Sequence, residues 1–150
     1  MILDDILKKT ESEFSVRTER ISCAEAYIYN KDNGNRIVIC DETPDAAGDD
    51  HEMIVQFSTQ HVHLDDPDDV VDYIRGIITD EILPIEFYDL SGKRRFGAEI
   101  GRGELDSLSV SSLQKLYPFV SGLREYYFEV HSFSGGYDIE RTPVSGLKEV

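Results

Sequence analysis

The stretch DDPDDVVDYIRGIITDEIL, residues 65–83, decides how this chain is expected to fold. Asp66 can accept hydrogen bonds from the free amides of a helix start, and Pro67 has the backbone angle that suits a first helical turn. Asp68 and Asp69 add negative charge where the helix macrodipole favours it. Together these residues predict that a helix begins here.

Apolar residues then recur at a spacing of three to four along the predicted helix: Val70, Val71, Ile74, Ile77, Ile78 and Ile82. Such a stripe is typical of an amphipathic helix that packs on a sheet. We therefore expect one main helix over about residues 68–83, ended by Pro84. A similar apolar face near the start of the chain, made by Ile2, Leu3, Ile6 and Leu7, predicts a short N-terminal helix.

Strand-like runs fill most of the remaining chain. They cover residues 14–18, 24–29, 36–41, 52–64, 85–89, 93–100, 124–133 and 137–142. Asn33 and Gly34 suit a turn with positive φ, so the runs on either side of them are expected to form a hairpin. Residues 41–50 are expected to form a mobile acidic loop, and residues 107–117 a further short helix.

Strands joined by tight turns pair antiparallel, and helices then cover one face of the sheet. The sequence therefore predicts an α+β fold: an antiparallel sheet of about six to eight strands, with the main helix and the short N-terminal helix packed on it. A chain of 150 residues has the size of one ordinary domain, so residues 1–150 are expected to form a single unit.

The chain carries a large excess of acidic residues. Thirty Asp and Glu oppose fifteen Lys and Arg, a net charge of −15, and the acids are concentrated in residues 41–52 and 65–72. Binding to nucleic acid or to an anionic membrane normally uses Lys and Arg against phosphate, so neither is expected as a direct partner. The N-terminal residues do not resemble an export signal, and no stretch is apolar enough to span a bilayer, which predicts a cytoplasmic protein.

His61, His63 and Asp65 alternate along a predicted strand, where alternate side chains share a face. Two imidazoles and a carboxylate can bind zinc or a similar ion, so these residues are the candidate metal ligands of the sequence. The other interpretation is an ordinary polar strand face next to a helix start. No nucleophile elbow, dinucleotide loop or Walker sequence is present, and we expect a protein without enzymatic activity or cofactor.

Small, single-domain, strongly acidic α+β proteins without a catalytic motif resemble bacterial immunity proteins. Residues 60–100 have a similar layout: a His-x-His strand end, an amphipathic helix, then Glu86-Phe87-Tyr88 and Phe96-Gly97 on a hairpin. The resemblance implies a protein that occupies a cognate toxin, many of which are basic nucleases. It assigns no functional residues to this chain.

The leading hypothesis is an acidic binding protein that inhibits a basic protein partner by covering its functional surface, most specifically an immunity protein for a toxin. Acids would steer the encounter, and tyrosine would supply desolvated contacts. The candidate contact residues are Asp45, Asp49, Asp50, Asp65, Asp66, Asp68, Asp69, Asp72 and Tyr127. Two alternatives stay open: a structural or assembly protein that acts as a homo-oligomer, for example a homodimer, and a metal-dependent enzyme that uses His61, His63 and Asp65.

Overall fold

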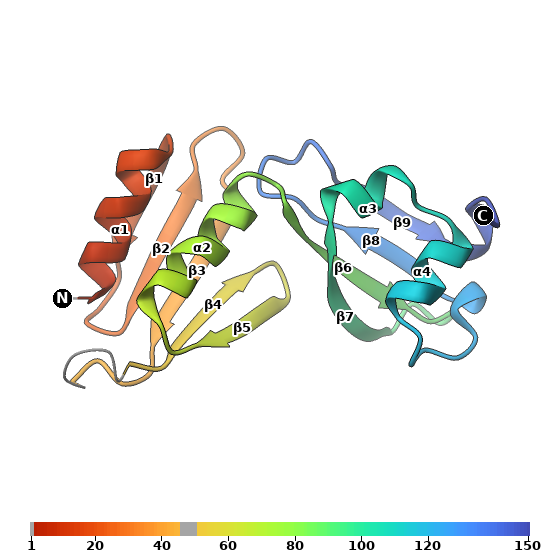
Figure 1. Cartoon of the computed structure of the whole chain (residues 1–150), viewed down its shortest axis with the longest axis horizontal. Coiled ribbons are helices and arrows are strands. Elements are labelled where there is room, and N and C mark those ends of the chain that lie inside the picture. The colour runs from red at the N-terminus through yellow and green to blue at the C-terminus, as the bar shows by residue number, and fades with distance from the viewer. Residues whose placement is uncertain (1, 46–50) are drawn as a thin grey trace.

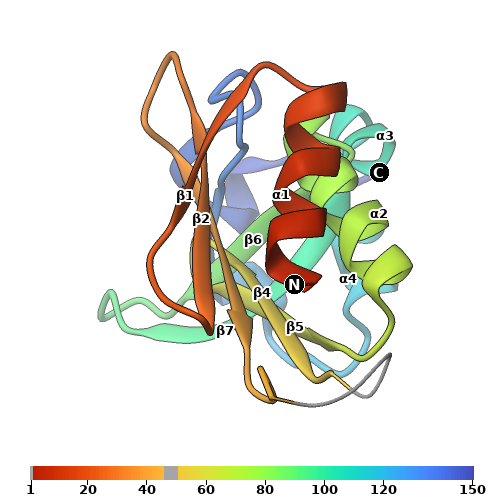
Figure 2. The ribbon, with the colours of Figure 1, turned by 90° about the vertical axis from the view of Figure 1, so that its left-hand side faces the viewer.

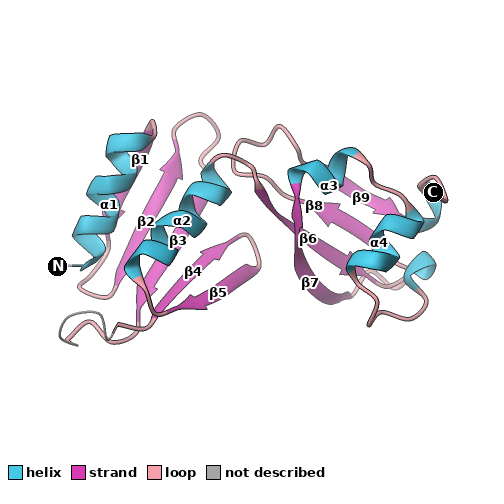
Figure 3. Cartoon of the chain, viewed as in Figure 1, coloured by secondary structure: helices cyan, strands magenta, loops and turns pink. Residues whose placement is uncertain are grey.

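A computed structural model describes residues 2–45 and 51–150 of the chain. Within these ranges, nine strands form two antiparallel sheets, one of five strands and one of four, and each sheet carries helices (Figures 1 and 3). The α+β class and the antiparallel pairing predicted from the sequence are confirmed. The strands are divided between two sheets, whereas the sequence predicted one sheet of about six to eight strands.

The first sheet is a meander in which each strand pairs with the next one along the chain. Its strands are β1 (Val16–Arg20), β2 (Glu25–Asn30), β3 (Arg36–Asp41), β4 (Met53–Phe57) and β5 (Gln60–Leu64). The predicted β2–β3 hairpin is confirmed, and Gly34 adopts the positive φ of 77° that its turn requires. The strand predicted over residues 52–64, with a bend or bulge near residues 58–60, is instead the β4–β5 hairpin. Ser58, with φ of 56°, makes a turn that no Gly, Pro or Asn announces.

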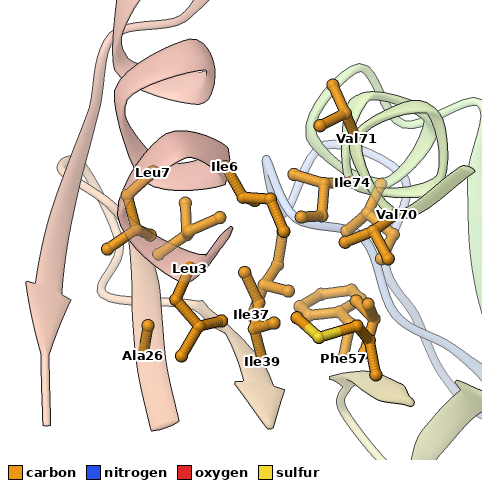
Figure 4. Packing of buried hydrophobic residues seen from close by; sticks show 14 of the residues in the cluster. Leu3, Ile6, Leu7, Ala26, Ile37, Ile39, Phe57, Val70, Val71 and Ile74 are labelled. Carbon is orange, nitrogen blue, oxygen red and sulfur yellow. The ribbon is translucent and has the colours of Figure 1, made fainter. Parts of the chain in front are cut away.

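Helices α1 (Ile2–Glu13) and α2 (Pro67–Ile78) lie side by side on one face of the first sheet (Figure 2). The first core forms between them and the sheet, where Leu3 and Ile6 of α1 and Ile74 of α2 meet Ile37 and Ile39 of β3 (Figure 4). All five side chains are fully or almost fully buried. Burial of such side chains is worth about 1.5–3 kcal/mol each, so this layer supplies much of the stability of the first half.

The start of α2 is as predicted, because the Asp66 carboxylate accepts a hydrogen bond from the Asp68 amide at 2.9 Å. Its end is not, since the helix stops at Ile78 rather than near residue 83. The chain turns at Asp80, which has a φ of 60°, and Ile82 already opens the next strand. Pro84 therefore does not end the helix but lies inside a strand.

The second sheet has the order β7 (Arg94–Gly101), β6 (Ile82–Tyr88), β8 (Tyr127–Val130) and β9 (Ile139–Pro143). Helices α3 (Arg102–Asp106) and α4 (Val110–Leu116) cover one of its faces, and the short turns η1 (Leu123–Glu125) and η2 (Val144–Gly146) complete this half. A second core forms there around Phe87 and Phe128. β6 pairs with β7 and β8 on its two sides, so it lies inside the second sheet and does not continue the first one.

The loop after β8 fastens the two halves together. Phe133 comes from this loop but is buried in the first core, where its ring lies edge-on to Phe57 with centroids 6.0 Å apart. The side-chain amides of Asn30, Asn33 and Asn35 donate hydrogen bonds to the Phe133 carbonyl oxygen at 2.8, 3.1 and 3.2 Å. The β2–β3 turn therefore grips the backbone of a segment about a hundred residues away in the chain.

Candidate functional site

Acidic residues gather at one end of the first sheet. The meander brings the end of β3, the start of β4 and the end of β5 to the same end of the sheet, and α2 starts directly after β5 (Figure 1). We call this region the acidic end and define it by its exposed acids: Glu42, Asp45, Glu52, Asp65, Asp66, Asp68, Asp69 and Asp72. Two acidic segments that lie apart in the sequence thus share one surface.

Two hollows mark this surface. Asp65, Asp66, Pro67 and Asp68 line a hollow of about 420 Å³. Glu52, Asp65 and His63 line a second hollow of about 350 Å³, together with Met53 and Leu64. Asp65 borders both hollows and therefore lies at the centre of the acidic end.

The predicted contact acids differ in how far the fold itself uses them. Asp66 caps α2, and Asp72 forms an ion pair with Arg75 at 2.6 Å. Asp45, Asp65, Asp68 and Asp69 are exposed and form no ion pair with any described residue. Asp68 and Asp69 face the positive end of the α2 macrodipole, which offsets part of their repulsion. Asp49 and Asp50 lie outside the described residues.

A half-buried apolar patch adjoins the acids on the uncovered face of the first sheet. The strand register places Cys40 opposite both Glu25 and Ile54, and Ile54 opposite His63. Cys40 and Ile54 are half-buried, whereas His63 is exposed. Burial, and then the negative charges of Glu25 and Glu42, raise the pKa of the Cys40 thiol. The thiol is therefore protonated at neutral pH and serves as a small apolar group rather than as a nucleophile.

The predicted metal ligands His61 and His63 lie together, with ring centroids 5.3 Å apart, on the exposed face of β5. Asp65 follows the strand and borders a hollow with His63. Within the described residues, the group of three side chains close enough to share one metal ion is a different one, and neither histidine of β5 belongs to it.

Tyr127 lies away from the acidic end. It is a half-buried residue of β8 in the second sheet, where it stands between Tyr88 and Pro143. The tyrosines that share the first sheet with the acids are Tyr27 and Tyr29 on its uncovered face. Tyr27 lies two residues nearer to the acidic end than Tyr29 does along β2. The Arg36 guanidinium lies over the Tyr27 ring, 4.6 Å from its centroid.

Several residues of this surface were not expected from the sequence. Glu52 and Ile54 join it only through the pairing of β4 with β3 and β5, which the prediction of one long strand over residues 52–64 concealed. A second polar group, Glu86, Glu129 and His131, lies on the second sheet and was also missed. The sequence feature that could have revealed this group is Glu86, the one acid inside the apolar run Ile82–Tyr88, because an acid in such a strand is expected to be buried.

No family model, curated protein or solved structure matches the chain. In the part of the chain that the structure describes, no helix has the length and apolar character needed to cross a membrane. The geometry and charge of the acidic end are the observations that bear on function.

Proposed function

We propose that this protein binds a basic protein through its acidic end and inhibits that protein by covering its functional surface. The observation that carries the proposal is that acids from two separate segments meet at one end of the first sheet, beside the half-buried pair Cys40 and Ile54. An immunity protein that neutralises a basic toxin, such as a nuclease, is the most specific form of the proposal.

Electrostatics favours a cationic partner. Asp65, Asp68 and Asp69 repel one another and have no ion pair with a described residue, in a chain whose net charge is −15. Crowding of like charges costs folding stability, and a basic partner would remove that cost on binding. The same field would attract the partner from a distance, so association would be fast at low salt and slower as salt rises.

The composition of the surface favours a protein as that partner. Protein interfaces place apolar groups at the centre and polar groups at the rim. Here Cys40 and Ile54 are flanked by Glu25 on one side and by Glu52 and Asp65 at the sheet edge. The apolar pair can contribute desolvated contacts, while the acids select positively charged partners and exclude negatively charged ones.

Capture of partners by the immobilised full-length chain tests the proposal. Lysate of the source cells is applied at low salt and at about 0.15 M salt, where the Debye length is about 8 Å, and bound proteins are identified by mass spectrometry. The proposal predicts a specific basic protein whose activity the chain inhibits in solution and whose recovery falls as salt rises. Recovery of no basic protein at either salt concentration would refute it.

A further inference from the structure

The second sheet carries a compact polar cluster on the face opposite α3 and α4. Glu86 of β6 and Glu129 of β8 are direct cross-strand neighbours, and His131 follows β8 on the same side. We call these three residues the Glu86 cluster. One ligand atom from each lies within 4.8 Å of the ligand atoms of the other two.

Glu86 is buried without enough partners. The exposed fraction of Glu86 is 2%, and its Oε1 atom has no hydrogen-bond partner. Among the described residues, every other buried side-chain nitrogen or oxygen has such a partner. A buried carboxylate oxygen without a partner is costly, so such atoms in native proteins normally face a donor, an ordered water or an ion. Oε1 is therefore the atom of the cluster that a donor, an ordered water or a positively charged ion would stabilise most.

The hydroxyl group of Tyr88 leads to the same conclusion independently. It lies 2.8 Å from Oε2 of Glu86 and 3.0 Å from Oε2 of Glu129. A phenol has one proton and can donate it to one of the two carboxylates only. The other contact is a close approach of two oxygen atoms, which a proton shared by the carboxyl groups or a metal ion bound between them would stabilise.

The neighbouring arginines leave the ligand atoms free. Nε of Arg94 is 3.6 Å from Oε2 of Glu86, beyond hydrogen-bond distance, and Nε of Arg141 binds Oε1 of Glu129 at 3.1 Å. Both guanidinium groups are more than two-fifths exposed, so water screens their charge. Oε1 of Glu86 has no partner, and Nε2 of His131 lies 3.5 Å from Oε2 of Glu129, which also accepts from Tyr88.

These atoms suit a divalent transition metal. Zinc binds imidazole nitrogen and carboxylate oxygen at about 2.0–2.2 Å, and a tetrahedral arrangement then places the ligand atoms about 3.3–3.6 Å apart. The distance of 3.5 Å between Glu129 and His131 already meets this requirement. Tyr88 would support the carboxylates from the outer shell, as the partners of metal ligands commonly do.

An entry path reaches the cluster. His131 also lines a polar cavity of about 490 Å³, whose other walls include Tyr29, Arg36 and Gln56 of the first sheet. Three protein ligands would leave a fourth coordination position for water or a small ligand. An ion held by His131 would therefore be accessible from this cavity rather than sealed in the sheet.

We propose that Glu86, Glu129 and His131 form a binding site for one divalent transition-metal ion, with zinc as the best match. The site is separate from the acidic end, and it does not depend on the function proposed for that surface. It also differs from the ligand set His61, His63 and Asp65 that the sequence suggested.

Zinc titration into the full-length, chelator-treated chain, followed by isothermal calorimetry, tests the site. One zinc ion should bind per chain. Glu86→Gln and His131→Ala should each weaken binding by at least the roughly 10–100-fold that loss of an outer-shell partner costs. The double variant His61→Ala/His63→Ala is the matched control, and it should bind zinc like the wild type.

Thermal unfolding with and without zinc shows whether the variants are folded. It also distinguishes a metal ion bound by the cluster from a proton shared by its carboxyl groups. Zinc should raise the unfolding temperature of the wild type and of the His61/His63 control, but not that of His131→Ala. If the carboxyl groups merely share a proton, zinc will not bind the wild type, and Glu86→Gln will be at least as stable as the wild type. That result, or loss of zinc binding in the His61/His63 control with retention in His131→Ala, would overturn the proposal.

Discussion

Nδ1 of His51 lies 2.8 Å from Oδ2 of Asp41, and both side chains are buried, with exposed fractions of 7% and 3%. Asp41 ends β3 and His51 precedes β4, so the pair closes the base of the β3–β4 connection. The amide of Glu42 donates to the carbonyl of Glu52 at 2.8 Å beside it. The buried pair thus holds Glu42 and Glu52 at the acidic end.

Removing His51 should destabilise the protein. His51→Ala leaves the Asp41 carboxylate buried without its hydrogen bond to the imidazole, although the Thr43 amide still donates to it at 3.0 Å, and loss of a hydrogen bond to a charged group costs about 1.5–3 kcal/mol. Urea unfolding followed by circular dichroism measures this change. His61→Ala, at an exposed position, should change the unfolding free energy by less than about 0.5 kcal/mol. Equal effects of the two substitutions would refute a structural role for the pair.

Phe133 should be critical for stability, because it contributes to the first core from the second half of the chain. Phe133→Ala is expected to lower the unfolding free energy by about 3–5 kcal/mol through loss of burial and creation of a cavity. The matched control is Phe119→Ala, since Phe119 is 74% exposed and its truncation should cost far less. A small effect at Phe133 would mean that the loop does not fasten the two halves.

Asp80 makes a second connection between the two halves, and substitutions that change its side chain test how much this connection contributes to stability. It adopts a φ of 60° and its Oδ1 accepts a hydrogen bond from the Ser134 amide at 3.1 Å. Asp80→Ala should cost about 1–3 kcal/mol, because alanine disfavours this φ and leaves the amide without its acceptor. Asp80→Asn keeps both properties and should retain most of the stability. Similar losses in both variants would contradict this explanation.

Stability should fall at alkaline pH because a buried tyrosine, Tyr117, and a half-buried one, Tyr73, both contact Glu99 of β7. Tyr117 donates to the Glu99 carbonyl at 2.8 Å, and Tyr73 donates to the Glu99 carboxylate. Burial is the main cause that raises the pKa of both phenols. The fold therefore favours their neutral form, and this contribution is complete below the unfolded pKa of about 10 and is lost as pH rises above it.

Urea unfolding measured at pH values on both sides of about 10 checks this sign. The wild type should lose stability as pH increases through this range, and Tyr117→Phe should lose less of it because that phenol is absent. A pH dependence that is unchanged in Tyr117→Phe and Tyr73→Phe would contradict the assignment.

Local signals made the start of α2 predictable, whereas the division into two sheets was not. Asp66 and Pro67 act on the turn that contains them, so the sequence alone places the helix start. The partners of β6 depend on pairing with β8, about forty residues further along the chain, and no local pattern specifies that choice. A bend near Ser58 could be expected from the sequence, but the full hairpin turn could not, because serine rarely adopts a positive φ.

In the candidate site, too, local features could be predicted from the sequence, whereas contacts between distant segments could not. Exposure of Asp65, Asp68 and Asp69 follows from their positions around a helix start and is readable from sequence. Their meeting with Glu52, and the meeting of Glu86 with Glu129, require a strand register that sequence patterns do not fix. Tyr127 was placed among the contact residues by residue type alone, and the sheet topology puts it in the other half of the molecule.

The most direct test of the proposed function is to neutralise the acidic end while leaving the fold intact. The triple variant Asp65→Asn/Asp68→Asn/Asp69→Asn removes three acids but keeps the Asp66 cap. Asp106→Asn/Glu125→Gln/Glu140→Gln is the matched control, since it removes three exposed acids from the second half.

Affinity for the captured basic protein is measured for wild type, triple variant and control at about 0.15 M salt. We expect the acidic-end variant to bind at least about tenfold more weakly, with a flatter salt dependence, and the control to bind nearly like the wild type. Equal weakening by both triple variants would show that net charge alone attracts the partner, and would contradict a binding site at the acidic end.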